Sequence, residues 1–152
     1  FLEHLGDMTP DFDAVEALAD EHDAAGVYAF TFDALGADSA AHGRCFVPGV
    51  GIDEDPVTGT ASGACGAYLD HFSAFSGGDT GGVPGSDAGN ADAETPEELV
   101  FEQGHYVDRP GRVHVRPGAG DGGAPVVGGD TVTAFEGAIR VSDSEDDEII
   151  EV

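Results

Sequence analysis

The stretch FVPGVGIDEDPVTGTASGACGAYL, from Phe46 to Leu69, decides the expected fold. Its first half is a turn rich in glycine, proline and carboxylates, and its second half consists mainly of small residues at helical spacing. Thr58 or Thr60 can act as the N-cap of a helix in this second half. Each interior glycine costs such a helix about 1 kcal/mol relative to alanine, so we expect tertiary packing in a tight core to hold the helix together.

The start of this helix is a candidate anion-binding site. The backbone N–H groups near Gly59, Thr60 and Ala61 have no partner inside the helix and lie at the positive end of its dipole. Asp55 stands just before them, where its carboxylate can exchange a proton with a bound ligand. These residues indicate half of an acid/base site, although capping of the turn or of the helix is a competing role for Asp55.

At these residues the chain resembles a known family. Residues 54–61, EDPVTGTA, resemble the EDPATGSA signature of the phenazine-biosynthesis (PhzF-like) isomerase family. Residues 44–48, RCFVP, resemble the R-x-F-x-P strand that precedes this signature. The pair QG at 103–104, followed by RP at 109–110, resembles a later segment of the family. The three landmarks occur in the same order and extend over most of the chain.

The resemblance implies an α+β fold similar to half of diaminopimelate epimerase, with a curved, mostly antiparallel sheet wrapped around a central helix. It also implies an isomerase or epimerase that uses no cofactor and no metal and moves a proton on a small carboxylated metabolite. By the same resemblance, Asp55 assists proton transfer, and Gly59 and Thr60 hold the substrate carboxylate through their backbone N–H groups. Thr60 stands where the family usually has serine, a change that keeps the hydroxyl.

The family's main acid/base glutamate lies in an N-terminal half, whereas this chain matches the C-terminal half. The N-terminal half of the same fold is therefore an expected partner, and a homodimer is possible. Two further functions remain open: a non-catalytic binding or self-association module that retains half of the epimerase fold, and a fold kept after catalysis was lost. If the sequence that precedes this chain in the same gene contains a strand followed by a turn with a glutamate, the enzyme is favoured over the other two functions.

The charge of the chain is unusual and excludes some partners. Asp and Glu number 31 against 5 Lys plus Arg, all of them arginine, for a net charge of −26. A lysine-free, acidic surface is typical of a protein from a halophile, where molar salt screens the repulsion among like charges. Nucleic-acid binding is not expected, because basic patches are lacking. No apolar run approaches the roughly 20 residues that span a membrane, so we expect a cytoplasmic protein.

The length of 152 residues predicts a single domain. We expect it to occupy residues 1–142, with a flexible, acidic and glycine-rich insertion at 76–93 and an acidic tail at 143–152. The acidic residues between 87 and 94 do not match the spacing of a calcium loop, so no metal site is expected there.

The remaining pattern predicts further helices and strands. Thr9-Pro10 is expected to begin a helix that continues from 11 to 25, and Phe72 and Phe75 are expected to complete the packing of the central helix. Strands are predicted at 27–32, 42–47, 99–103, around 113–115, at 131–135 and at 138–141, with a helical turn at 95–98.

Several reactive side chains have simpler interpretations. Cys45 and Cys65 are expected to be small, buried hydrophobic residues rather than an acid/base pair. Glu54 is expected to be a surface or turn carboxylate. The histidines form no paired cluster in the sequence, and only His42 and His105 lie near the segments that resemble the family.

Overall fold

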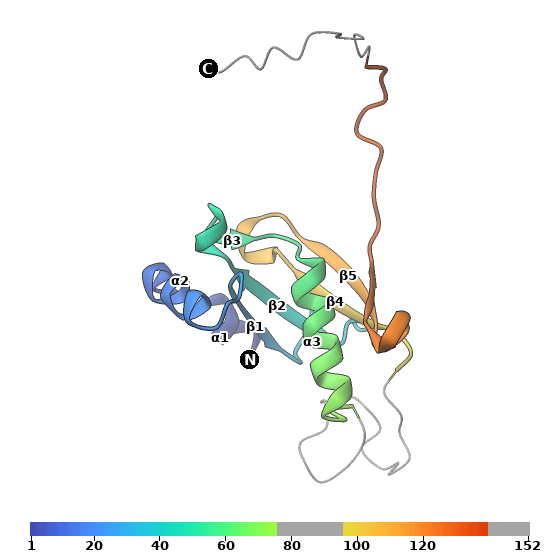
Figure 1. The fold of residues 1–152 in the computed structure, drawn as a ribbon, viewed down its shortest axis with the longest axis horizontal. Helices are drawn as coiled ribbons and strands as arrows, with labels where there is room; N and C mark the ends of the chain where they lie inside the picture. Colours follow the sequence, from blue (N-terminus) through green and yellow to red (C-terminus); the bar gives the residue numbers. More distant parts are fainter. Residues whose placement is uncertain (76–95, 140–152) are drawn as a thin grey trace.

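The computed structural model describes residues 1–75 and 96–139 and has an α+β fold, as predicted (Figure 1). The α-helices are α1 (Leu2–Gly6), α2 (Phe12–Glu21) and α3 (Gly59–His71), and the strands are β1 (Val27–Thr31), β2 (Ala41–Phe46), β3 (Glu54–Asp55), β4 (Leu99–Gln103), β5 (Gly111–Arg116) and β6 (Val126–Gly128). Short 3-10 helices, η1 to η3, lie at Pro48–Val50, His105–Val107 and Asp121–Gly123.

The strands form one open sheet in the order β1-β2-β4-β5-β6, and β3 also pairs with β2. Neighbouring strands are antiparallel except β2 and β4, which run parallel. The expected mostly antiparallel sheet is therefore confirmed. Parallel neighbours need a crossover connection, and the path from β2 to β4 passes through α3.

Strand β2 is buried along its whole length because helices cover both of its faces. Successive side chains of a strand point to opposite faces. Ala41 belongs to the core beneath α3. Arg44 and Phe46 face the other way: Arg44 donates to the carbonyl of Leu5 in α1 over 2.9 Å, and the ring of Phe46 packs edge-on against Phe12 of α2.

Helix α3 lies across the sheet, and its small residues allow it to lie close (Figure 1). A Cβ atom added at Gly66 would lie 2.7 Å from Cγ1 of Val115 in β5, closer than such atoms approach. The expected tight packing of a glycine-rich helix is therefore present. The buried core cluster around it consists of Ala41, Cys65, Leu69, Phe75, Leu99, Phe101, Val113 and Val115.

The N-terminal helices differ from the prediction. Helix α2 is capped by Asp11, whose Oδ1 accepts a hydrogen bond from the backbone N–H of Ala14, and not by the Thr9-Pro10 pair. It ends at Glu21 instead of residue 25, because the chain turns through a left-handed conformation at Asp23. The five-residue helix α1 was not predicted, since it is too short to show a periodic pattern.

The strands predicted after residue 130 are wrong over the described residues. Residues 131–139 form no strand there, and a short strand, β6, precedes them at Val126–Gly128. In Figure 1 the segment after β6, residues 131–139, extends away from the sheet. Val132, Phe135 and Ile139 are 91%, 85% and 91% exposed. The local sequence suits a strand, but a strand also needs a neighbouring strand, and the described part of the chain supplies none to this segment.

Other predictions had mixed outcomes. Phe75 is buried in the core, whereas Phe72 is 63% exposed and does not complete the packing of α3. Residues 96–98 are not helical. The insertion at 76–93 with its acidic run, and the tail at 143–152, lie outside the described residues. Within the described residues, none of the helices has both the length and the apolar composition that crossing a membrane requires.

Candidate active site at the start of helix α3

The three residues predicted to form the site lie together at the entrance to α3. Asp55 is the last residue of β3 and is paired across the ladder with Cys45 of β2. Thr58 is the N-cap residue of α3, with extended backbone angles, and Gly59 and Thr60 form the first helical positions. Asp55 and Gly59 are half-buried, and Thr60 is exposed. A carboxylate thus stands beside the N–H groups of the first helical turn, in contact with solvent.

Thr58 and Gln103 hold this turn in place from two sides. The hydroxyl of Thr58 donates to Oδ2 of Asp55. Gln103, fully buried at the end of β4, donates from Nε2 to the carbonyl of Asp55 over 2.6 Å and to Oγ1 of Thr58 over 2.9 Å. Its Oε1 accepts from the backbone N–H of Thr58 over 3.2 Å. Sequence reasoning singled out the pair at 103–104 as a landmark but assigned no role to Gln103.

Gly104 brings the next loop against the same turn. Its φ of +84° lies in the left-handed region, and a Cβ atom there would lie 2.5 Å from the carbonyl oxygen of Pro56 and 2.2 Å from that of Arg109. Both the backbone conformation and the lack of space require glycine at this position. The QG pair therefore joins the end of β4 to the turn that contains Asp55.

A cavity of about 240 Å³ adjoins the first turn of α3. Its lining residues come from the start of β1, from β2 and from the helix entrance: Ala25, Gly26, Val27, Tyr28, Cys45, Val47, Thr58, Thr60 and Ala61. This space lies beside the N–H groups of the first turn and has a volume suited to part of a small metabolite.

The cysteine and tyrosine side chains near this cavity are held neutral. Burial raises the pKa of the Cys45 thiol, and the carboxylates of Asp55 and Glu54 act in the same direction, although the side chain of Thr58 opposes the shift. Burial also raises the pKa of Cys65 to about 12. The pKa of Tyr28 rises to about 12, mainly through burial, although a hydrogen bond with Ser62 opposes the shift. Both cysteines are free and buried, as predicted, and neither is poised as a thiolate.

Glu54 is not a surface carboxylate, so that prediction is wrong. Its side chain is 6% exposed and forms a two-pronged ion pair with Arg44, from Nε to Oε1 over 3.1 Å and from the second terminal nitrogen to Oε2 over 2.8 Å. Arg44 also donates to the carbonyls of Leu5 and Met8. The alternation of strand β3 explains the error, because Glu54 and Asp55 point to opposite faces of the sheet.

The two histidines near the landmarks form a second group, in which His42 is fully buried and His105 is half-buried. The rings of His42 and His105 lie 4.7 Å apart, and Nδ1 of His42 is 3.1 Å from Oε2 of Glu102. Within the described residues, Nε2 of His42 and Nδ1 of His105 are buried without a hydrogen-bond partner. His42 lies on the face of β2 opposite the core beneath α3. This group therefore belongs to the packing of α1 and η2 rather than to the site at Asp55.

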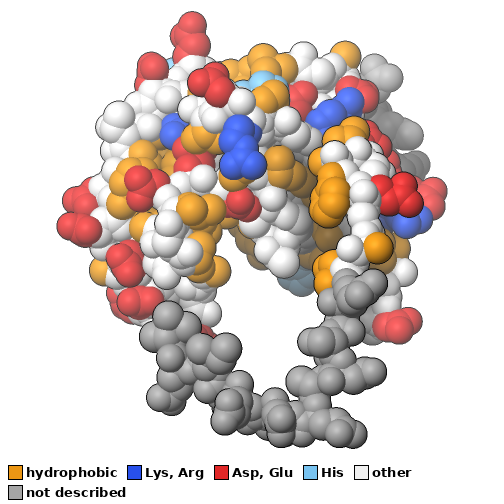
Figure 2. Space-filling model, turned by 90° about the horizontal axis from the view of Figure 1, so that it is seen from above, with side chains coloured by type: hydrophobic (Ala, Val, Ile, Leu, Met, Phe, Trp, Pro, Cys, Tyr) orange, Lys and Arg blue, Asp and Glu red, His pale blue; other side chains and the backbone are white. Residues whose placement is uncertain are grey.

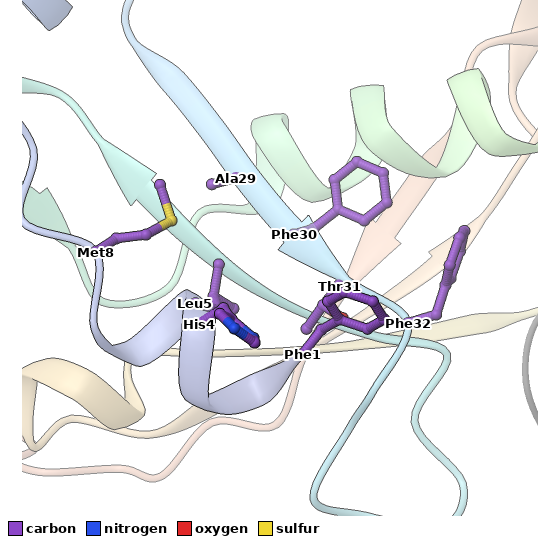
Figure 3. A pocket seen from close by; sticks show the side chains of 8 residues that line it. All are labelled: Phe1, His4, Leu5, Met8, Ala29, Phe30, Thr31 and Phe32. Atoms are coloured by element: carbon purple, nitrogen blue, oxygen red, sulfur yellow. The ribbon is translucent and has the colours of Figure 1, made fainter.

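A larger cavity of about 450 Å³ lies between α1 and the edge strand β1 (Figure 3). Its lining is mainly apolar, with Leu5 and Met8 on one side and, on the other, Phe30 of β1 and Phe32, which follows that strand. His4 is its one ionisable side chain among the described residues. This cavity lies at α1 and β1, away from the entrance to α3 where Asp55 stands, so the site at Asp55 remains the better candidate.

The charges on the molecule do not mark a second site. In Figure 2 acidic side chains are scattered over the visible face, and the few arginines lie among them. Over residues 1–75 and 96–139, no three His, Cys, Asp or Glu side chains converge as metal ligands.

The geometry defines a class of protein: an α+β domain in which a carboxylate stands at the entrance to a small-residue helix, beside the N–H groups of its first turn and a cavity. Comparison with known families identifies the class. The chain belongs to the phenazine biosynthesis-like (PhzC-PhzF) family, whose model matches residues 2–137.

Individual relatives agree with this assignment. An uncharacterized isomerase from Clostridium acetobutylicum is 41% identical over 70 residues, which is 46% of this chain and 23% of the relative. The uncharacterized isomerase YfhB of Bacillus subtilis is 35% identical over 115 residues, 75% of this chain and 33% of the relative. The chain therefore spans a third or less of the length of these relatives.

A solved structure extends the agreement to the fold. The Bacillus anthracis phenazine biosynthesis protein of the PhzF family superposes with a TM-score of 0.56 at 26% identity. The match covers 83% of this chain and 38% of that protein. The mixed α+β, PhzF-like fold predicted from the signature is therefore confirmed.

Proposed function

We propose that this chain is the part of a cofactor-independent isomerase or epimerase that holds a small carboxylated metabolite and assists the transfer of a proton at carbon. Asp55 exchanges the proton, and the N–H groups of Gly59 and Thr60 receive the substrate carboxylate. The observation that carries the proposal is the position of Asp55 at the open start of α3, beside those N–H groups.

The chemistry follows from this placement. Removing a proton from the carbon next to a carboxylate develops negative charge on that carboxylate, and helix N–H groups stabilise it most in the transition state. An isomerase needs a second acid or base on the opposite side of the substrate. We assign that group to a glutamate in the N-terminal half of the same fold, in keeping with the family resemblance.

The experiment is hydrogen exchange at carbon. The full product of the gene, in high salt and D₂O, is incubated with a panel of small α-substituted carboxylic acids, and deuterium incorporation is followed by NMR. We expect Asp55→Asn to lower the exchange rate about 10²-fold to 10⁴-fold, the usual contribution of a general acid or base, with little change in stability. Cys65→Ser, a control at a buried thiol off the proposed site, should retain most of the rate. Full activity in Asp55→Asn rules out the role of Asp55.

A second candidate function is a module that binds or self-associates without catalysis. It is favoured by the exposure of Val132, Phe135 and Ile139, three large apolar side chains within eight residues. If this module is the function, light scattering on the full gene product should show a dimer that Phe135→Ser together with Ile139→Ser dissociates. A monomer that exchanges substrate hydrogen supports the isomerase instead.

A further inference from the structure

Gln103 is hydrogen-bonded to Thr58 and to the backbone of Asp55. Its side chain is fully buried, and its amide group makes three hydrogen bonds to the turn from Asp55 to Thr58. The two bonds from Nε2 and the one to Oε1 fix the orientation of the amide. A flipped amide would set an oxygen against the Asp55 carbonyl and two donors against the N–H of Thr58.

This orientation leaves the hydroxyl proton of Thr58 available for the next hydrogen bond. A threonine hydroxyl carries one proton and two lone pairs. Because Oγ1 of Thr58 accepts a hydrogen bond from Nε2 of Gln103, its own proton is free to point to Oδ2 of Asp55. The three side chains form a hydrogen-bond chain: Gln103 donates to the Thr58 hydroxyl, and this hydroxyl donates to the Asp55 carboxylate.

The alternative role of Thr58 is that of an ordinary helix cap. A threonine at the N-cap position usually accepts a hydrogen bond from the second or third N–H of the helix, and this bond is worth about 1 kcal/mol. In the described structure the side chain of Thr58 makes no such bond. The hydroxyl is directed to Asp55 instead, so it does not occupy the N–H groups of the first turn.

We infer that Gln103 is a positioning residue that acts through the Thr58 hydroxyl to fix the Asp55 carboxylate. With Oδ2 held by this hydroxyl, rotation of the carboxylate is restricted and Oδ1 keeps one direction relative to the start of α3. The inference rests on the proposed function for its effect on catalysis. The hydrogen-bond chain itself has a separate, structural readout.

The kinetic test uses near-isosteric variants of the full gene product in the hydrogen-exchange assay. Thr58→Val removes the hydroxyl and keeps the shape. Gln103→Glu keeps the size but presents a carboxylate that accepts the hydroxyl proton and draws it away from Asp55. We expect each variant to lower kcat about tenfold to a hundredfold, the range of a hydrogen bond to a charged group, with KM changed less than about twofold.

Two further results separate positioning from general stability. Thr58→Ser retains the hydroxyl and should recover most of kcat. The double variant Thr58→Val with Gln103→Glu should be no slower than the slower single variant, because both interrupt the same chain. Val113→Ala, a core change outside the site, serves as the stability-matched control. The inference is overturned if Thr58→Val keeps full kcat, if the two effects multiply, or if Val113→Ala slows turnover equally.

A structural measurement covers the case in which the proposed function fails. If the wild-type protein exchanges no hydrogen on any carboxylic acid tested, the side-chain amide signals of Gln103 are recorded by ¹⁵N NMR in the same protein. If the hydrogen-bond chain is present, the side-chain amide protons of Gln103 exchange slowly with solvent, and their signals shift in both Thr58→Val and Asp55→Asn. Rapid exchange, or signals unchanged in Asp55→Asn, contradicts the inference.

Discussion

The residues that surround Asp55 illustrate how alternation along a strand separates two tasks. Glu54 and Asp55 are adjacent, yet one completes a buried ion pair and the other stands at the helix entrance. The ion pair also connects β2 to α1, because Arg44 bonds to carbonyls of that helix. A buried charge that loses its partner is costly, whereas the intact pair is close to neutral for stability.

We therefore predict that Glu54→Gln destabilises the protein by about 3–5 kcal/mol. The cost arises because the Arg44 guanidinium remains buried with its charge unmatched. Urea unfolding of the variant and of the wild type measures the difference. Glu98→Gln, at a half-exposed carboxylate near His114, is the control and should change stability by less than about 1 kcal/mol. Equal effects of the two substitutions contradict the prediction.

His42 gives a second prediction at this scale, in its pH dependence. Burial lowers the pKa of His42 below its ordinary 6.5, and the neighbouring His105 adds to the shift, although Glu102 opposes it. Below pH 6.5 the unfolded chain takes up a proton that the folded protein does not. The contribution of His42 to stability is thus complete above pH 6.5 and declines as the pH falls toward its lowered pKa.

The measurement is the free energy of unfolding between pH 5 and 8 for the wild type and for His42→Gln. We expect the two curves to be parallel above pH 7 and to converge as the pH falls. The other five histidines are present in both proteins, so the two curves differ only through the residue at position 42. Curves that stay parallel down to pH 5 show that His42 does not carry this dependence.

At the scale of elements, a helix or strand was predicted correctly where the residues within it determine its structure, and incorrectly where a distant segment is needed. The small-residue pattern after Thr58 was sufficient to predict α3 and its close packing, because glycine at a helix interior needs a packing reason. The alternation of Val113 and Val115 likewise predicted β5, where both are buried. Segment 131–139 has an equally good strand pattern but no neighbour, and a pattern does not show whether a neighbouring strand is present.

The site likewise has a part that is determined locally and a part that depends on distant residues. Asp55, Gly59 and Thr60 are close in sequence, and the signature identified them together. The contact with Gln103 joins residues 45 positions apart and depends on the register of two strands. The sequence marked this segment without revealing the hydrogen bonds that it makes.

A prediction follows for the glycines of α3. Gly66→Ala should destabilise the protein by about 1–3 kcal/mol, although alanine favours a helix, because the new methyl group would overlap Val115. Adding Val115→Ala should recover part of this loss by removing the overlapping atoms, and thermal unfolding of the single and double variants checks both points. Stabilisation by Gly66→Ala alone means that α3 has room to move away from β5.

At the scale of the whole molecule, the net charge of −26 governs the response to salt. Acidic side chains are spread over the visible face with few cations among them (Figure 2). Repulsion among them favours the expanded, unfolded chain unless salt screens it.

We propose that the protein is adapted to high salt and predict that its free energy of unfolding increases between 0.1 M and 2 M KCl. Sucrose at matched water activity is the control, since it does not screen charge. A rise with sucrose as large as the rise with KCl, or no rise in KCl, removes the basis for the proposed adaptation.

The parallel pairing of β2 with β4 has a consequence for folding. β1 with β2, and β4 with β5, are antiparallel pairs of strands close in sequence, whereas β2 and β4 are about 60 residues apart along the chain. Contacts between distant segments form late, because closing a long loop costs chain entropy before the contacts repay it. Asp55 and Thr58 belong to one side of this junction and Gln103 to the other. We therefore expect the hydrogen-bond chain at the site to form after the two local strand pairs, so that a partly folded chain with only those pairs formed would still lack it.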